Sequence, residues 1–469
     1  MTAENSGMAM EEYLGIDQLE GPLAIIENAS DVGYGEIGEV IAPDGSIRLG
    51  QVLEVSNEHA VLQLLGNSTN LRPSELIIRF QGHPLKVPVA EEMLGRVFDG
   101  LGNPRDGLPL PIAEKRVFAQ GEPLNPSARS YPRDYIQTGI SSIDAMNTLV
   151  RGQKLPIFSG EGLPHNELVA QIANQAKLAE ENEPFAIIFA AMGVSHDDAR
   201  FFEESLTKKG INKVALFLNL ADDPPIERII TPNVALSLAE FLAYDKGIHV
   251  LVILTDMTNY GEAIRQIALR REEVPTRKGY PGHLYSDLAT IYERCGMVKG
   301  RPGSITQMPV LSMPNDDITH PIPDLTGYIT EGQIVLTRDL NKKSIYPPID
   351  VLTSLSRLMK DAIGKSRTRA DHPDLSNQLY AAYAYVQEVR SLAEVIGEEE
   401  LSPLDQKYMA FGDAFEQQFL GQGPDESRDM NTTLDLGWQL LSLLPEDELT
   451  RVSEQELKEH YPQKVSDAG

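Results

Sequence analysis

The residues from Ser159 to Asn166 lie between an apolar run and a helical pattern, where a strand–loop–helix phosphate-binding loop is expected. A working loop reads G-x-x-x-x-G-K-[ST]: its glycines form a tight turn, its lysine contacts phosphates and its hydroxyl binds magnesium. In this register Ser159 and Pro164 stand at the two glycine positions, His165 at the lysine position and Asn166 at the hydroxyl position. The residues between them are Gly160, Glu161, Gly162 and Leu163.

These substitutions change the chemistry of the loop while its shape is kept. Pro164 has no backbone N–H, so one donor of the loop is missing. His165 is shorter than lysine and mostly neutral at pH 7, and the amide of Asn166 is a poorer magnesium ligand than a hydroxyl. We expect nucleotide binding at this loop to be weak or absent. A structural turn without any ligand is the alternative, although the helix N-terminus would still present N–H groups to an anion.

Asp256 follows the apolar segment 248–254, which is predicted to be a buried strand. A carboxylate at the end of such a strand holds magnesium in working nucleotide-binding folds. A strand-end aspartate also caps the helix that follows it, and without the lysine and the hydroxyl we favour this capping role. The nine histidines and the single cysteine show no metal-ligand spacing, so no metal site is predicted.

The wider pattern places the loop in the middle of a three-part α/β chain. Residues 1–20 are expected to form a disordered tail. Residues 21–85 carry short β-branched segments separated by turns, which predicts a small β-barrel. Residues 86–370 alternate strands with helices, which predicts a largely parallel sheet, and residues 371–469 show helical periodicity. Within the central part, Thr231 and Pro232 predict the start of a helix.

The composition limits the partners of the chain. Its 69 acidic and 41 basic residues give a net charge of -28, which repels nucleic-acid phosphates. No apolar run approaches the roughly 18 residues of a membrane span. Cys295, the single cysteine, fits a reducing compartment. We expect a cytoplasmic protein that binds no nucleic acid, does not insert into the membrane and is peripheral to it through an assembled complex.

Three stretches carry a resemblance to a known family. Residues 347–356, PPIDVLTSLS, match P-[SAP]-[LIV]-[DNH]-x-x-x-S-x-S, a signature of the nucleotide-binding subunits of rotary ATPases. Residues 158–167 resemble the altered loop of the B subunit of V-type and archaeal A-type ATPases, and residues 280–294 are also typical of that branch. The resemblance covers roughly residues 21–444. It implies a RecA-like, P-loop-type nucleotide-binding domain between a β-barrel and a C-terminal helical bundle.

The resemblance also implies a role for Arg357, which follows the signature directly. Family B subunits alternate with catalytic A subunits in an A3B3 hexamer, and ATP or ADP with Mg²⁺ binds at their interface. Arg357 would then be an arginine finger in trans, neutralising the charge that phosphoryl transfer spreads over the equatorial oxygens. Val194 stands where catalytic relatives carry a glutamate base, and it cannot orient a water. From spacing alone, a salt-bridged surface arginine is the alternative for Arg357.

These observations predict a non-catalytic, regulatory B subunit of a proton- or sodium-translocating rotary ATPase or ATP synthase. Central and peripheral stalk subunits are implied as further partners. The acidic run 397–405 would contact the central stalk by resemblance, whereas its composition equally predicts a solvated turn. One alternative function is a stand-alone homohexameric ATPase, which requires Gly-Lys-Thr at 164–166. The other is a scaffold with no share in any active site.

Overall fold

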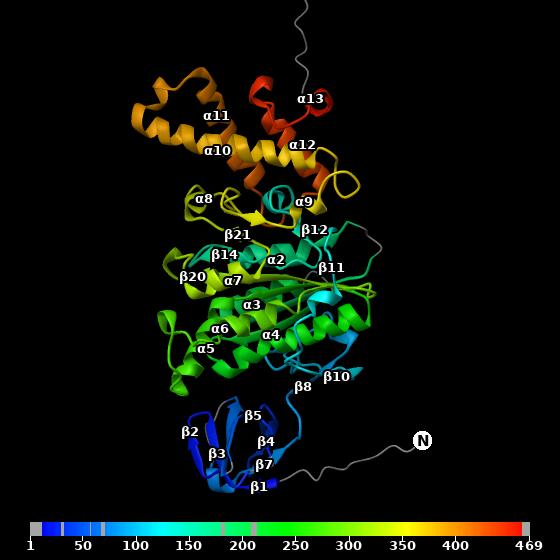
Figure 1. Cartoon of the computed structure of the whole chain (residues 1–469), viewed down its shortest axis with the longest axis vertical. Coiled ribbons are helices and arrows are strands. Elements are labelled where there is room, and N and C mark those ends of the chain that lie inside the picture. The colour runs from blue at the N-terminus through cyan, green and yellow to red at the C-terminus, as the bar shows by residue number, and fades with distance from the viewer. Residues whose placement is uncertain are drawn as a thin grey trace, which may run out of the picture.

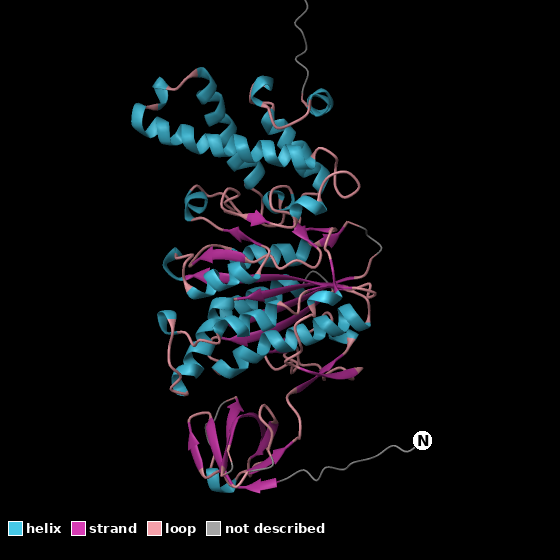
Figure 2. Cartoon of the chain, in the orientation of Figure 1, coloured by secondary structure: helices cyan, strands magenta, loops and turns pink. Residues whose placement is uncertain are grey.

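The computed structural model describes residues 12–29, 32–56, 58–66, 71–179, 183–207 and 213–461. Three parts are stacked along one long axis, with a small β-part at one end, a mixed part in the middle and helices at the other end (Figure 1). Figure 2 shows the strands of the middle part lying between helices. The predicted α/β fold class, with a β-part before the parallel sheet and a helical part after it, is confirmed.

The N-terminal part is a seven-stranded antiparallel sheet in the order β1-β7-β4-β5-β6-β3-β2. Its strands are β1 (Glu12–Leu14), β2 (Gln18–Glu20), β3 (Leu23–Glu27), β4 (Ile37–Ile41), β5 (Ile47–Val55), β6 (His59–Leu65) and β7 (Ile77–Phe80). Burial alternates along β3 and β7, as expected for strands with one face on a core. That core is a cluster of its own, which includes Ala24, Leu62 and Ile78.

The prediction of a disordered tail is wrong for residues 12–20. β1 pairs with β7 and β2 pairs with β3. Between them Ile16 is only 4% exposed, and its N–H donates to the carbonyl of Pro73 at 2.8 Å. The segment is ordered because it supplies backbone partners to both ends of an existing sheet and a side chain to its core. Residues 1–11 lie outside the described residues.

The central part is built on a sheet in the order β22-β21-β14-β20-β18-β16-β17-β9, in which all these pairs except β21–β22 are parallel. Its strands are β9 (Val97–Asp99), β14 (Ile157–Gly160), β16 (Phe185–Val194), β17 (Val214–Leu220), β18 (His249–Thr255), β20 (Ser304–Met313), β21 (Gly332–Val335) and β22 (Leu355–Ser356). β17 and β18 are buried along their whole length, as strands covered on both faces are.

Helices and short strands surround this sheet. The helices are α1 (Ser141–Asp144), α2 (His165–Gln175), α3 (His196–Thr207), α4 (Pro225–Glu240), α5 (Met257–Arg270), α6 (Leu284–Tyr292), α7 (Pro321–Ile329), α8 (Arg338–Lys342) and α9 (Met359–Ala362). The short strands are β8 (Lys86–Val89), β10 (Lys115–Phe118), β11 (Arg129–Ser130), β12 (Tyr135–Gln137), β13 (Leu149–Val150), β15 (Lys177–Leu178) and β19 (Gly296–Val298).

The start of α4 differs from the prediction. The helix begins at Pro225, and Pro232 lies inside it. Pro225 takes the first helical position, where a proline loses no hydrogen bond. Thr231 therefore caps nothing, and its Oγ1 donates to the carbonyl of Glu227 at 2.9 Å within the helix. The dipeptide that predicted a helix start is thus an interior proline with the preceding threonine.

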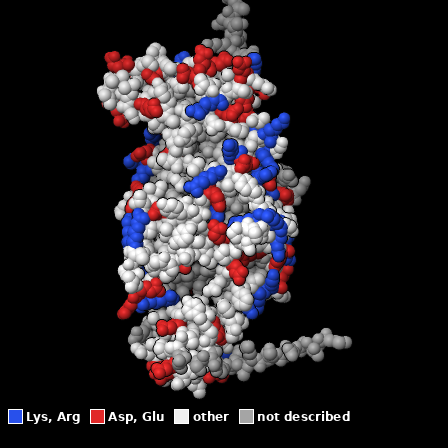
Figure 3. All heavy atoms as spheres, viewed as in Figure 1, with Lys and Arg blue, Asp and Glu red and all other residues white. Residues whose placement is uncertain are grey.

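The C-terminal part consists of helices. They are α10 (His372–Ile396), α11 (Pro403–Ala414), its π-helical continuation η8 (Phe415–Leu420), α12 (Met430–Leu441) and α13 (Glu454–His460). Phe415 stacks on Phe411 and on Phe419, in a core that is continuous with the core on one side of the central sheet. Acidic side chains gather over these helices on the face shown in Figure 3. No helix in the part of the chain that the structure describes is long and apolar enough to cross a membrane.

Candidate functional site

The phosphate-loop position lies between β14 and α2, at the carboxyl end of a central parallel strand. Ser159 is fully buried, and its Oγ donates to the carbonyl of Gly160 at 3.1 Å and lies 3.1 Å from Nδ1 of His165. Asn166 donates from Nδ2 to Oδ1 of Asp198 at 3.0 Å. The side chains at the lysine and hydroxyl positions are therefore held by the protein itself.

The backbone of the loop is also partly satisfied from within. The N–H of Leu163 donates to the carbonyl of Gly160 at 3.2 Å, and the N–H of His165 donates to the carbonyl of Leu163 at 2.8 Å. Pro164, the N-cap of α2, makes no side-chain cap. Gly162 has φ +77°, a conformation that glycine adopts without strain. The loop keeps a turn of the expected kind, but it offers few free donors to a phosphate.

Asp316 and Arg338 lie against this loop, and sequence reasoning missed both. Arg338 pairs with Asp316 and donates from Nη2 to the carbonyl of Glu161 at 2.8 Å. The two residues follow β20 and β21, the strands on either side of β14. No sequence motif could have found them, because only the pairing of the three strands brings positions 160, 316 and 338 together.

Asp256 stands at the end of β18 and is the N-cap of α5. Its Oδ1 accepts the N–H groups of Thr258 at 2.7 Å and Ser312 at 3.2 Å, and its Oδ2 accepts the hydroxyl of Ser312 at 2.5 Å. The carboxylate is buried and joins α5 to the end of β20. These bonds describe a helix cap that also links two strands of the sheet.

Val194, which the resemblance places where catalytic relatives carry a base, is the last residue of β16 and is buried. The preceding backbone is held by amides: Asn259 donates from Nδ2 to the carbonyls of Met192 and Gly193 at 3.0 and 3.1 Å. The N–H of Gly193 donates to Oδ1 of Asn219 at 3.1 Å. No carboxylate stands at residue 194 itself to orient a water.

Arg357 follows β22, the strand at the border of the central sheet. Ser356 is buried and donates from Oγ to the carbonyl of Thr148 at 2.8 Å, which fixes the strand just before the arginine. The Arg357 side chain is exposed, and its Nη1 donates to the carbonyl of Thr330 at 3.2 Å. Among the described residues Arg357 makes no ion pair, so its charge faces outward without a carboxylate partner.

A cavity of about 240 Å³ lies beside α2, between α3 and residues 424–425. Gln171 crosses its wall, accepting from the hydroxyl of Tyr346 at 2.9 Å and donating to the carbonyl of Gly423 at 3.0 Å. Two acceptors at its edge, on Asn174 and Gln175, have no hydrogen-bond partner within the described ranges of the chain. The cavity adjoins the helix that starts at the loop, but the glutamine ties its two sides together.

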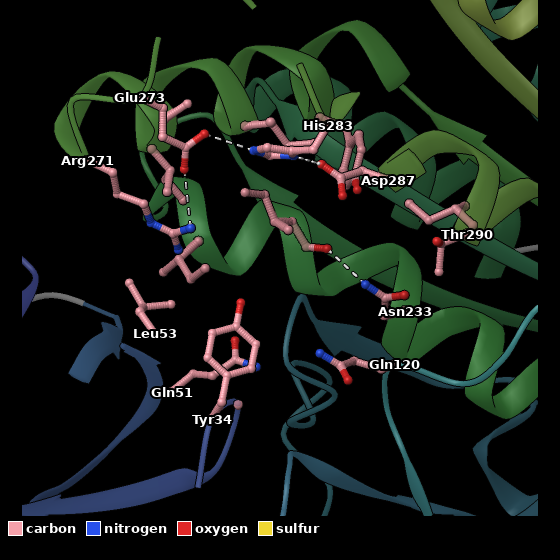
Figure 4. A pocket seen from close by; sticks show the side chains of 18 of the residues that line it. Tyr34, Gln51, Leu53, Gln120, Asn233, Arg271, Glu273, His283, Asp287 and Thr290 are labelled. Carbon is pink, nitrogen blue, oxygen red and sulfur yellow. Dashed lines mark hydrogen bonds and ion pairs between the residues drawn. The ribbon is translucent and has the colours of Figure 1, made fainter. Parts of the chain in front are cut away.

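A second cavity, of about 360 Å³, lies between the N-terminal β-part and the central part (Figure 4). On its rim His283 lies 2.6 Å from Asp287 and 3.0 Å from Glu273. Burial lowers the pKa of His283, but the two carboxylates outweigh it and the pKa is raised overall. Arg271 donates across the junction to Oε1 of Gln63 at 3.1 Å. None of the predicted site residues lines this cavity, and its lining residues come from both the N-terminal and the central part.

The site is a strand–loop–helix turn at the carboxyl edge of a parallel sheet, in a domain between a β-part and a helical part. Family models match most of the chain. The beta-barrel domain of the ATP synthase alpha/beta family matches residues 16–82, and the nucleotide-binding domain of that family matches residues 139–356. The C-terminal domain of V and A type ATP synthase matches residues 361–461.

Full-length relatives narrow the class. The V-type ATP synthase beta chain of Halothermothrix orenii is 57% identical over 463 residues, which are 98% of this chain and 100% of the relative. The B subunit of the A-type ATP synthase of Aeropyrum pernix is 57% identical over 456 residues, 97% of this chain and 98% of the relative. The chain therefore belongs to the V-type and A-type ATP synthase B (beta) subunit family, and the predicted resemblance is confirmed.

A solved structure supports the same assignment. The ATP synthase subunit NeqB from Nanoarcheaum equitans superposes with a TM-score of 0.72 at 39% sequence identity. The match covers 90% of this chain and 100% of that one. The chain is thus a subunit of the V/A-type ATP synthase complex and carries the family's nucleotide-binding domain.

Proposed function

We propose that this chain is the non-catalytic, regulatory subunit of the ring, and that it lends Arg357 to the ATP site of a neighbouring catalytic A subunit. One observation carries the proposal: the arginine is exposed, has no carboxylate partner among the described residues, and follows the edge strand of the nucleotide-binding sheet. The chain's own loop, two strands away, has its side chains engaged internally. The positive charge of Arg357, next to the edge strand β22, is therefore available to a neighbouring subunit.

The chemistry that Arg357 supplies is charge stabilisation. A guanidinium placed beside the transferred phosphoryl group neutralises negative charge that develops on its equatorial oxygens. Its planar fork of donors matches two oxygens at once, which an ammonium does not. The hydrogen bond to Thr330 and the buried Ser356 hold the arginine in place before the partner arrives, and this lowers the entropic cost of positioning it.

The chain's own loop does not fit Mg²⁺ with a nucleotide. Pro164 lacks the N–H, His165 contacts Ser159, and the amide of Asn166 is bonded to Asp198. ATP or ADP with Mg²⁺ would therefore bind at the boundary with the catalytic A subunit in an A3B3 hexamer, with binding at this chain's own site weak or absent. Central and peripheral stalk subunits would complete the complex, which is cytoplasmic and peripheral to the membrane. In this proposal residues 397–405 face the central stalk.

The test is the Arg357→Ala variant assembled with its catalytic partner. The complex is expected to form but to hydrolyse ATP far more slowly, because only the trans charge is removed. Hydrolysis at the parental rate would show that Arg357 is not a finger. A stand-alone ATPase would instead turn over ATP as the purified chain. A pure scaffold would hold Arg357 more than about 10 Å from the partner's nucleotide in the assembled complex, beyond any direct hydrogen bond.

A further inference from the structure

The ion pair of Asp316 and Arg338 crosses over the phosphate loop. Asp316 lies in the turn after β20 and Arg338 begins α8 after β21, while the loop follows β14 between them. Nε and Nη2 of Arg338 donate to the two carboxylate oxygens of Asp316 at 2.5 and 2.9 Å. Nη2 also donates to the carbonyl of Glu161 at 2.8 Å, so the ion pair is hydrogen-bonded directly to the loop backbone.

The carboxylate of Asp316 packs directly on the loop backbone. A methyl group added to Gly160 would overlap Oδ1 of Asp316 and would lie 3.0 Å from Nη2 of Arg338. Glycine at position 160 therefore lets the ion pair lie close to the loop backbone, and a larger residue there would force the Asp316 side chain to shift. The space immediately above the first turn of the loop is filled by a carboxylate and a guanidinium of the same chain.

We propose that Asp316 is the residue that excludes polyphosphate from this loop, because its carboxylate and the Arg338 guanidinium already stand where an anion and its counter-cation would bind. The proposal rests on the proposed function, in which this loop is not a catalytic site, and it assigns the exclusion to a named pair. In a working loop, anionic phosphate oxygens lie between the loop backbone and a lysine. Here the Asp316 carboxylate lies against the loop at Gly160, and the Arg338 guanidinium bonds both that carboxylate and the loop carbonyl of Glu161.

The turn that carries Asp316 supports this assignment. Asn315 and Asp316 both have φ of +57°, a left-handed conformation that is uncommon for residues other than glycine. Such strain persists only where the surroundings hold it, and it is concentrated at functional sites. The hydrogen bonds from the Arg338 guanidinium also lower the pKa of Asp316.

The ion pair is open to solvent on one side. The Arg338 and Asp316 side chains are 41% and 44% exposed, and exposed ion pairs are weak and sensitive to salt. Removing the Asp316 charge would therefore release Arg338 without unfolding the site. The released guanidinium would stay near the loop through the carbonyl of Glu161, where it would meet an incoming phosphate group.

The experiment is a titration of the purified full-length chain with MgADP and, separately, with inorganic pyrophosphate, by calorimetry at low salt. Asp316→Asn is expected to bind both probes at least about tenfold more tightly than the parent. The double variant Asp316→Asn with Arg338→Gln should lose that gain, because the released cation is what attracts the anion. Asp317→Asn is the matched control: it removes a neighbouring carboxylate paired with Lys278 at 2.5 Å, and it should leave affinity unchanged.

Equal affinity of Asp316→Asn and the parent would overturn the proposal, as would an equal gain in Asp317→Asn, which would show a general charge effect. An unchanged thermal unfolding midpoint in each variant excludes loss of the fold, and Asp316→Ala serves as the second variant. These outcomes are independent of Arg357. If Asp316→Asn fails while Arg357→Ala still abolishes hydrolysis in the complex, only the exclusion mechanism is wrong. If Arg357→Ala has no effect while Asp316→Asn gains affinity, only the proposed finger is wrong.

Discussion

The loop after β14 and the arginine after β22 lie two strands apart in one sheet, yet the hydrogen-bond partners of their polar side chains differ. At the loop, His165, Asn166 and Arg338 all bond to side chains of the same chain. At the edge strand, the one hydrogen bond of the Arg357 side chain within the described part of the chain goes to a backbone carbonyl. A charge without a carboxylate partner needs either solvent or a neighbouring molecule. The polar side chains of the loop are therefore hydrogen-bonded within the chain, whereas the Arg357 guanidinium faces outward and can bond to another molecule.

The largest effect is expected from Arg357→Lys, which keeps the charge but removes the planar fork. ATP hydrolysis by the assembled complex should fall by about a hundredfold or more, since trans arginines in related phosphoryl transfer contribute about 10³–10⁵ in rate. Arg301→Lys is the matched control, because Arg301 is an exposed arginine that pairs with Asp245. Steady-state rates at saturating ATP measure the effect. A rate within about twofold of the parent would contradict a role for Arg357 in the partner's site, and the two regions would then not differ in function.

The next test restores the loop. A chain with Ser159→Gly, Pro164→Gly, His165→Lys and Asn166→Thr regains the side chains of a working loop. We expect at most about a tenfold gain in MgADP affinity, because the Asp316–Arg338 pair remains over Gly160. No ATP turnover by the isolated variant is expected, because Val194 still replaces the base. ATP turnover above the background of the parent chain would show that the altered loop alone had prevented hydrolysis by this subunit.

A moderate loss of stability is expected from Asp256→Ala. The variant leaves the first turn of α5 uncapped and the hydroxyl of half-buried Ser312 without its acceptor. Losses of this kind cost about 1–3 kcal/mol, and the midpoint of urea unfolding should fall accordingly. Asp339→Ala, at an exposed position that pairs with Lys342, is the control. If the complex lost hydrolysis while the unfolding midpoint stayed the same, Asp256 would be a ligand residue and the loop region would not be silent.

The smallest effect concerns Glu227 of α4, away from both regions. Burial, followed by repulsion from Asp223 and Asp99, raises the pKa of Glu227 from 4.5 to about 7. The folded state thus holds a proton that the unfolded state has released, so stability falls as pH rises through this window and stays low above it. Glu227→Gln should leave the thermal midpoint unchanged near pH 4.5 and raise it increasingly up to about pH 7. A gain that is largest at acidic pH would contradict this sign.

Much of the fold followed from periodicity and turns. The segments around β16, β17 and β18 are almost continuous apolar runs, and runs of this kind are typical of buried parallel strands. The start of α4 was predicted wrongly because two prolines compete for the same role, and Pro225 stands closer to the preceding turn than Pro232. The order in residues 12–20 escaped prediction because it depends on edges supplied by β3 and β7.

The amino-acid sequence by itself determined the family, the altered loop and the position of Arg357, because each is written in contiguous residues whose chemistry needs no distant partner. Only the tertiary structure decided that Asp316 and Arg338 meet beside Gly160 and that no carboxylate of the described ranges pairs with Arg357. The physical reason is strand order. Parallel pairing of β20, β14 and β21 carries three turns that are far apart in the chain to one edge, and it leaves β22 at the border.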